Sequence, residues 1–140
     1  MGKETVLFVC THNSSRSQMA EGLLRAHYGD RYAVYSAGTQ PSGVNPFAIA
    51  AMRDLAIDLS DHRSEHIDQF ADMPMDYVVT VCDSARESCP YLPAKQQNIH
   101  HSFEDPSAVN GTDAEKLAAF RRIRDEIKVW LDETFSASSV

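Results

Sequence analysis

The stretch VLFVCTHNSSRS, Val6–Ser17, joins an uninterrupted apolar run to a polar loop that contains an arginine. Consecutive apolar residues are typical of a strand that is buried on both faces, as in a parallel sheet. From Ser17 to Tyr28 apolar residues recur at the spacing of one helix face, and Gly29 follows as a stop signal. The stretch therefore predicts a strand, a short loop and a helix in direct succession.

The rest of the chain repeats this alternation. The predicted strands are Thr5–Val9, Tyr32–Ala37, Tyr77–Val81 and, more weakly, Gln97–His101. The predicted helices are Ser17–Tyr28, Pro46–Leu55, a short Ser64–Phe70 and Thr112–Phe135, with Asn45 as a cap and Thr112 and Glu115 as a capping box. Strands separated by helices predict an α/β fold with a parallel sheet. No repeat or linker divides the chain, so we expect a single domain over residues 1–140, with 136–140 as a frayed tail.

Composition narrows the class of protein. Thirteen Lys and Arg against twenty Asp and Glu give a net charge of −7, which disfavours nonspecific nucleic-acid binding. No apolar run has the length of a membrane span, and the N-terminal residues lack the apolar stretch of a signal peptide. We therefore expect a cytoplasmic protein without membrane or nucleic-acid partners.

The sequence has three cysteines, Cys10, Cys82 and Cys89. Because this number is odd, a purely structural set of disulfides would leave one cysteine unpaired. In the cytoplasm, disulfides are usually transient, catalytic or sensing. Cys10 and Cys82 each follow a predicted strand, and ligands of parallel sheets bind beyond the carboxyl ends of the strands. The two thiols are therefore expected to share one site.

The loop from Cys10 to Ser17 has the features of an anion cradle. Its backbone N–H groups and the first turn of the following helix can surround a tetrahedral oxyanion, which Arg16 can clamp. The same field favours the thiolate of Cys10, to which Ser17 can donate a hydrogen bond. Asn13 can hold the loop through bonds to the backbone. The competing interpretation, a buried structural cysteine before an ordinary helix cap, is the simpler one for a bare Cys-x5-Arg pattern.

Two further features fit this chemistry. Asp105, stiffened by Pro106, can protonate a departing oxygen, although an ordinary Asp-Pro turn is the alternative. The spacing of Cys82 and Cys89 is unusual for zinc, and a redox pair fits better than two unrelated thiols. If the residues between them form a helical turn, that segment must unwind for the disulfide to close.

The pattern Cys10-x5-Arg16-Ser17 with a late Asp105-Pro106 resembles the low-molecular-weight protein tyrosine phosphatase fold. The similarity is closer to thioredoxin-coupled arsenate reductases with three redox cysteines over CTHNSSRSQMAEG, SAG at Ser36–Gly38, VVTVCDSARESCPYLP and FEDP. The resemblance implies a single three-layer α/β domain with a central four-stranded parallel sheet flanked by helices and a phosphate-binding loop.

The resemblance also implies a mechanism. Cys10 attacks arsenate, Asp105 protonates the departing oxygen, and Cys82 then attacks the Cys10 sulfur so that arsenite leaves. Cys89 attacks Cys82 in turn, and thioredoxin reduces the resulting Cys82–Cys89 disulfide. The implied substrate-binding residues, for arsenate or its mimics phosphate and sulfate, are Thr11, His12, Asn13, Ser14, Ser15, Arg16 and Ser17.

No tightly bound cofactor is implied, and we expect a monomer. Some members of the family bind a potassium ion, for which the matching positions are Asn13, Glu21, Ser36 and Glu65. His12 stands where some relatives have glycine, and it either adds positive charge near the thiolate or faces solvent.

Three other functions stay open from the sequence. A phosphatase acting on phosphotyrosine or a small ester needs only Cys10, Arg16 and Asp105, but no aromatic pair follows Asp105-Pro106. A reductase that uses a small thiol would not need both Cys82 and Cys89. An oxyanion-binding or redox-sensing module that does not turn over would not need a residue for every catalytic role. This sequence has a candidate for each of these roles.

Overall fold

The computed structural model describes residues 2–82 and 92–136. Its strands and α-helices are β1 (Glu4–Cys10), α1 (Arg16–Tyr28), β2 (Tyr32–Gly38), α2 (Pro46–Arg53), β3 (Tyr77–Thr80), β4 (Gln97–His100) and α3 (Asp113–Leu131). Two 3₁₀ turns, η1 (Ile67–Phe70) and η2 (Pro106–Ala108), and a π-helical turn, η3 (Asp132–Ser136), complete the described elements. The four predicted strands and the three longer predicted helices are confirmed, although α3 ends at Leu131 rather than at Phe135.

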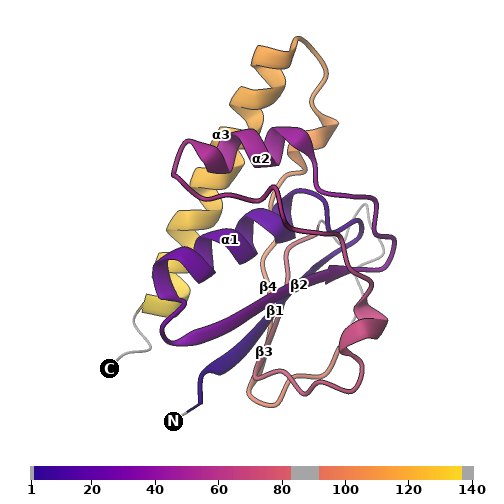
Figure 1. Cartoon of the computed structure of the whole chain (residues 1–140), viewed down its shortest axis with the longest axis vertical. Helices are drawn as coiled ribbons and strands as arrows, with labels where there is room; N and C mark the ends of the chain where they lie inside the picture. The colour runs from indigo at the N-terminus through magenta and orange to yellow at the C-terminus, as the bar shows by residue number, and fades with distance from the viewer. Residues whose placement is uncertain (1, 83–91, 137–140) are drawn as a thin grey trace.

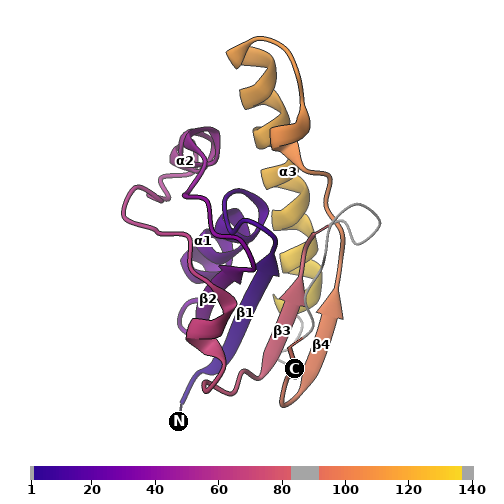
Figure 2. The ribbon, with the colours of Figure 1, turned by 90° about the vertical axis from the view of Figure 1, so that its right-hand side faces the viewer.

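The four strands form one parallel sheet, seen nearly edge-on in Figure 1, and their order is β2-β1-β3-β4 (Figure 2). β1 lies between β2 and β3, which explains why its residues from Val6 to Cys10 are buried and why the sequence there is apolar without interruption. Its last residue, Cys10, is paired with Gly38 at the end of β2. The predicted parallel α/β fold is confirmed, and the carboxyl ends of β1 and β2 lie side by side.

Three layers follow from the alternation of side chains along β1. Val6 and Phe8 pack into the larger core beneath the three α-helices, whereas Leu7 and Val9 pack into a smaller cluster on the opposite face. That second face is covered by η1 and by the segments that carry Met75, Leu92 and Ala94. Figure 2 shows α1, α2 and α3 gathered on one side of the sheet and η1 on the other.

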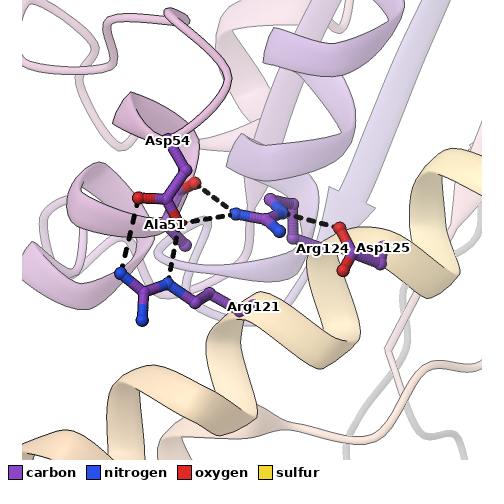
Figure 3. Close-up of polar contacts among 5 residues, drawn as sticks. All are labelled: Ala51, Asp54, Arg121, Arg124 and Asp125. Carbon is purple, nitrogen blue, oxygen red and sulfur yellow. Dashed lines mark hydrogen bonds and ion pairs between the residues drawn. The ribbon is translucent and has the colours of Figure 1, made fainter.

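A buried arginine ties α2 to α3 (Figure 3). Arg124 Nη1 donates to the carbonyl of Ala51 at 2.7 Å and to Asp54 Oδ2 at 2.9 Å, while its Nε donates to Asp125 at 2.8 Å. Arg121 Nε also donates to Asp54, and this bond is the main cause of the lowered pKa of the Asp54 carboxyl. The charge of Arg124 is thereby paired, as a buried guanidinium requires.

Caps fix where the helices begin. The Asn45 side chain accepts a bond from the backbone N–H of Phe47, and Thr112 with Glu115 forms the predicted capping box at the start of α3. No helix in the described residues is both long and apolar enough to cross a membrane. Of the expected frayed tail, residues 137–140 lie outside the described part of the chain, and Ser136 ends η3.

The predicted helix over Ser64–Phe70 is wrong for its first half. Only Ile67–Phe70 is helical, as a 3₁₀ turn. The preceding residues are drawn toward the Cys10–Ser17 loop and the end of β2: the carbonyl of Glu65 accepts a bond from Gly38 N at 2.8 Å, and His66 forms an isolated parallel bridge with Gly38. Backbone groups that are bonded in this extended arrangement cannot take part in a helix.

Candidate active site

A cavity of about 230 Å³ lies over the loop that joins β1 to α1. The residues that line it are Cys10, His12, Ser14, Ser15, Arg16, Ser42, Asn45, Asp105 and Ser107. Ser15 is the N-cap of α1, but within the described residues its side chain makes no capping bond. The N–H groups of the first turn of α1, together with the positive end of the helix dipole, therefore remain suited to bind an anion.

The thiol of Cys10 is free, almost fully buried and hydrogen-bonded at the end of β1. Its Sγ lies 3.0 Å from Ser17 Oγ, and Asn13 Nδ2 donates to the same Ser17 oxygen at 2.8 Å. Because an amide nitrogen can only donate, Ser17 accepts from Asn13, and its own proton is available for the sulfur. The structure thus has the hydrogen bond between Ser17 and the Cys10 sulfur that the sequence predicts.

Asn13 organises the loop from within. Its φ of 50° is left-handed, a conformation in which asparagine is enriched among residues other than glycine. Its Oδ1 accepts bonds from Glu65 N at 2.9 Å and Gln18 Nε2 at 3.0 Å, and its carbonyl accepts one from Ser64 Oγ at 2.7 Å. The predicted role of Asn13 in shaping the loop is confirmed.

Gln18 is a site residue that the sequence analysis missed. Its side chain is fully buried, and its Nε2 donates to Asn13 and to the carbonyl of Arg63 at 3.0 Å. Its Oε1 lies 3.0 Å from His62 Nδ1. Gln18 thus joins the Cys10–Ser17 loop to the segment before η1. The only signal in the sequence is a polar residue on the buried side of a helix.

Arg16 and Asp105 face the same cavity from different elements. Arg16 is buried, its Nη1 donates to the carbonyl of Phe103 at 3.1 Å, and its Nη2 lies 3.7 Å from Asp105 Oδ2. Asp105 caps η2 through bonds to its other oxygen from Ser107 N at 3.0 Å and Ser107 Oγ at 2.7 Å. The structure therefore brings the predicted anion clamp and the predicted acid together.

His12 lies at the mouth of the cavity. It is exposed, and its Nδ1 is 3.1 Å from the carbonyl of Gln40. Thr11 and Ser14 contribute backbone carbonyls that accept bonds from Gln40 N and Asn45 N. His12 is thus open to solvent and also lines the cavity that holds Cys10, so its role near the thiolate stays a prediction.

Cys82 follows β3 at the same edge of the sheet as Cys10. Val81 N donates to the carbonyl of Val9 at 3.0 Å, so the residues that precede the two cysteines are bonded to each other. Cys82 is buried and disulfide-bonded, and Ser102 Oγ donates to its carbonyl at 3.2 Å. The third predicted cysteine, Cys89, lies outside the described residues, so the proposed pairing of Cys82 with Cys89 stays a prediction.

The four residues suggested for potassium are only partly brought together. Ser36 Oγ donates to Glu21 Oε1, whereas Asn13 meets the backbone amide of Glu65 rather than its carboxylate. Both bonds to Asn13 Oδ1 come from protein N–H groups, and Arg25 is paired with Glu21 Oε2. Within the described part of the chain, no group of three or more His, Cys, Asp or Glu residues could hold a metal ion.

Comparisons with known proteins agree with this geometry. A family model described as low molecular weight phosphotyrosine protein phosphatase matches residues 5–137. A protein of Halalkalibacterium halodurans named arsenate reductase is 48% identical over 127 residues, which cover 91% of this chain and 91% of the relative.

Two solved structures share the fold. One, described as an arsenate reductase in the phosphate binding state, is 34% identical with a TM-score of 0.78 and covers 96% of this chain and 98% of its own. The other, a thioredoxin-dependent arsenate reductase from Corynebacterium glutamicum, is 26% identical with a TM-score of 0.67. That likeness covers 96% of this chain and 63% of the other.

Proposed function

This chain belongs to the low-molecular-weight phosphotyrosine protein phosphatase family, and we propose that within it the chain reduces arsenate to arsenite with Cys10 as the nucleophile. The observation that carries the proposal is the free Cys10 thiol in a cavity that Arg16 and Asp105 also line, with Cys82 just beyond the end of the adjacent strand. A phosphatase of this family needs the first feature and has no use for the second.

The first step joins sulfur to arsenic. The Cys10 thiolate attacks arsenate held by Arg16 and the N–H groups of the loop, and one hydroxyl group of arsenate takes a proton from Asp105 and leaves as water. Arg16 lies close enough to Asp105 to bind the same oxyanion that Asp105 protonates. Because the whole chain carries a net charge of −7, the attraction for the anion is local to this loop.

The second step moves two electrons to arsenic. The Cys82 thiolate attacks the Cys10 sulfur, a Cys10–Cys82 disulfide forms, and the electron pair of the breaking S–As bond stays on arsenic, which leaves as arsenite. Cys89 then attacks Cys82, which frees the Cys10 thiolate and transfers the disulfide to Cys82–Cys89. The dithiol of thioredoxin then reduces the Cys82–Cys89 disulfide and thereby replaces the two electrons that arsenic received.

The likeness to a thioredoxin-dependent reductase supports thioredoxin as the electron donor. The cycle uses the thiols of one chain, without a tightly bound cofactor and without nucleic acid or a membrane. We therefore propose a monomeric enzyme that serves arsenic detoxification. It works in the cytoplasm, where thiols are kept reduced.

Phosphate-ester hydrolysis is the second candidate function, favoured by the family match and by the completeness of the Cys10, Arg16 and Asp105 set. This reaction gives no role to Cys82. We propose it only as a weak side activity, since phosphate and arsenate have the same shape and charge.

The test is consumption of NADPH in the presence of arsenate, thioredoxin and thioredoxin reductase, comparing the wild type with Cys89→Ala. We expect sustained arsenate-dependent turnover for the wild type and at most a single turnover for Cys89→Ala. Wild type that consumes no NADPH with arsenate but hydrolyses an aryl phosphate would reverse the two candidates. Cys82→Ala serves as a second variant, because it should stop the cycle before arsenite leaves.

A further inference from the structure

Three oxygen acceptors converge between α1 and β2, outside the cavity described above. The carboxylate of Glu21 extends from α1, and the hydroxyl of Ser36 and the carbonyl of Val34 belong to β2. Ser36 is buried, and its hydroxyl donates to Glu21 Oε1. Arg25 Nη2 donates both to Glu21 Oε2 and to the carbonyl of Val34.

This set of acceptors calls for a positive charge. β2 is an edge strand of the sheet, so a carbonyl on its outer side needs a partner from elsewhere in the fold. The Glu21 side chain is only 13% exposed, and a carboxylate with so little access to water is stabilised by a paired cation. Carboxylate, carbonyl and hydroxyl oxygens are also the ligands that a hard metal cation prefers.

Of the four residues expected to bind a potassium ion, Asn13 and Glu21 already have partners for their side-chain oxygens. Asn13 Oδ1 accepts two N–H bonds, which occupy both of its lone pairs, and the contact of Asn13 with Glu65 is through the Glu65 backbone amide. The guanidinium of Arg25 stands against the carboxylate and the carbonyl. The residues present therefore do not fit a bound potassium ion.

We propose that the guanidinium of Arg25 is the built-in cation of this site and takes the place of a potassium ion. Its contacts tie α1 to β2. α1 begins with Arg16 and Ser17, and β2 ends at Gly38, which is paired with Cys10. Arg25 is thus a positioning residue for the base of the anion-binding loop, and this inference does not depend on which anion the loop binds.

Thermal unfolding in KCl and in NaCl at equal ionic strength tests the proposal without any activity assay. For the wild type we expect the same Tm in both salts. Arg25→Ala should lower the Tm in NaCl by about 2–6 °C, because a partly buried carboxylate and an edge carbonyl lose their partner. KCl should restore at least half of that loss with a saturating dose dependence, since a small cation can then reach the vacated acceptors.

The control is Arg122→Ala, which removes an arginine of similar exposure that is paired with the exposed carboxylates of Glu126 and Glu104 on the surface of α3. It should change the Tm little and give no difference between the salts. Adding Glu21→Gln to Arg25→Ala should abolish the response to KCl. Three results would each overturn the proposal: a higher wild-type Tm in KCl than in NaCl, a loss in Arg25→Ala no greater than in Arg122→Ala, or an Arg25→Ala variant that responds equally to both salts.

Discussion

At the scale of single residues, hydrogen bonds connect Asn13 through Ser17 to the sulfur of the nucleophile, Cys10. Asn13 donates to Ser17, and Ser17 is left with its proton for the Cys10 sulfur. A hydroxyl aimed at sulfur stabilises the thiolate, which is the reactive form, more than the thiol. The side chain of Asn13 is fixed in the orientation that this series of hydrogen bonds needs, because its Oδ1 accepts bonds from Gln18 and Glu65.

Ser17→Ala removes the last donor of this series of hydrogen bonds. We expect the rate of Cys10 alkylation by iodoacetamide at neutral pH to fall about tenfold, which corresponds to the loss of one hydrogen bond to a charged group. Mass spectrometry that follows the Cys10 peptide measures this rate. Ser60→Ala, a change of an exposed serine outside the cavity, is the control. An unchanged rate in Ser17→Ala would show that the hydroxyl does not act on the sulfur.

The sequence predicts those residues whose partners are near in the chain. Ser17 and Asn13 belong to one loop with Cys10, so their roles follow from the loop itself. Gln18 could not be recognised, because its partner Arg63 is 45 positions away. The carbonyl of Phe103, which accepts a bond from Arg16, is 87 positions away and carries no side-chain signal at all.

At the scale of elements, the anion-binding loop packs closely against the end of β2, where Gly38 has no side chain. A Cβ on Gly38 would lie 2.5 Å from the carbonyl oxygen of Thr11 and 2.8 Å from that of Cys10. Both atoms are backbone and cannot rotate aside. Gly38 is therefore required where β2 passes beneath the loop.

Gly38→Ala should push the loop away from β2 and impair anion binding as well as stability. We expect the free energy of unfolding to fall by about 1–3 kcal/mol, the usual cost of overpacking. We also expect the increase of Tm on adding phosphate to be lost. Gly2→Ala is the control, because a Cβ there meets no atom within 4 Å. A variant that keeps both the wild-type Tm and its response to phosphate would contradict the argument.

The elements themselves were predictable where one local signal governs them. The apolar run of β1 and the capping box of α3 each determine an element without help from distant residues. The segment Ser64–Phe70 differs because Asn13 and Gly38 bind its first residues in an extended conformation. Competition of this kind depends on the assembled sheet, so local helix propensity predicts the wrong state.

At the scale of the whole molecule, acidic side chains that have partners in the fold make stability depend on pH. Asp76 Oδ2 accepts bonds from Thr5 N at 2.8 Å and Thr5 Oγ1 at 3.2 Å, which join the start of β3 to β1. The bond from the Thr5 backbone N–H is the main cause of the lowered pKa of Asp76. A bond from Lys128 likewise lowers the pKa of Asp132 beside the C-terminal end of α3.

The direction of the pH effect follows from these shifts. A carboxyl whose pKa is lower in the folded than in the unfolded chain stabilises the fold above the unfolded value of about 3.9. This contribution is lost as the pH falls through the folded pKa. We expect the free energy of unfolding in urea to begin to decrease below about pH 5 and to continue to fall below the unfolded value of about 3.9. Asp76→Asn should be less stable than the wild type at neutral pH by about 1 kcal/mol, because its hydrogen bonds lose their charge.

The difference between Asp76→Asn and the wild type should shrink on acidification, because the wild-type carboxyl becomes neutral as well. Asp30→Asn, a change at an exposed position, should keep the wild-type dependence on pH. If the free energy of unfolding of Asp76→Asn and of the wild type fell in parallel over the whole acid range, the carboxylate of Asp76 would not be the group that makes stability depend on pH. The acid sensitivity would then belong to the remaining paired carboxylates, first among them Asp132 and Asp54.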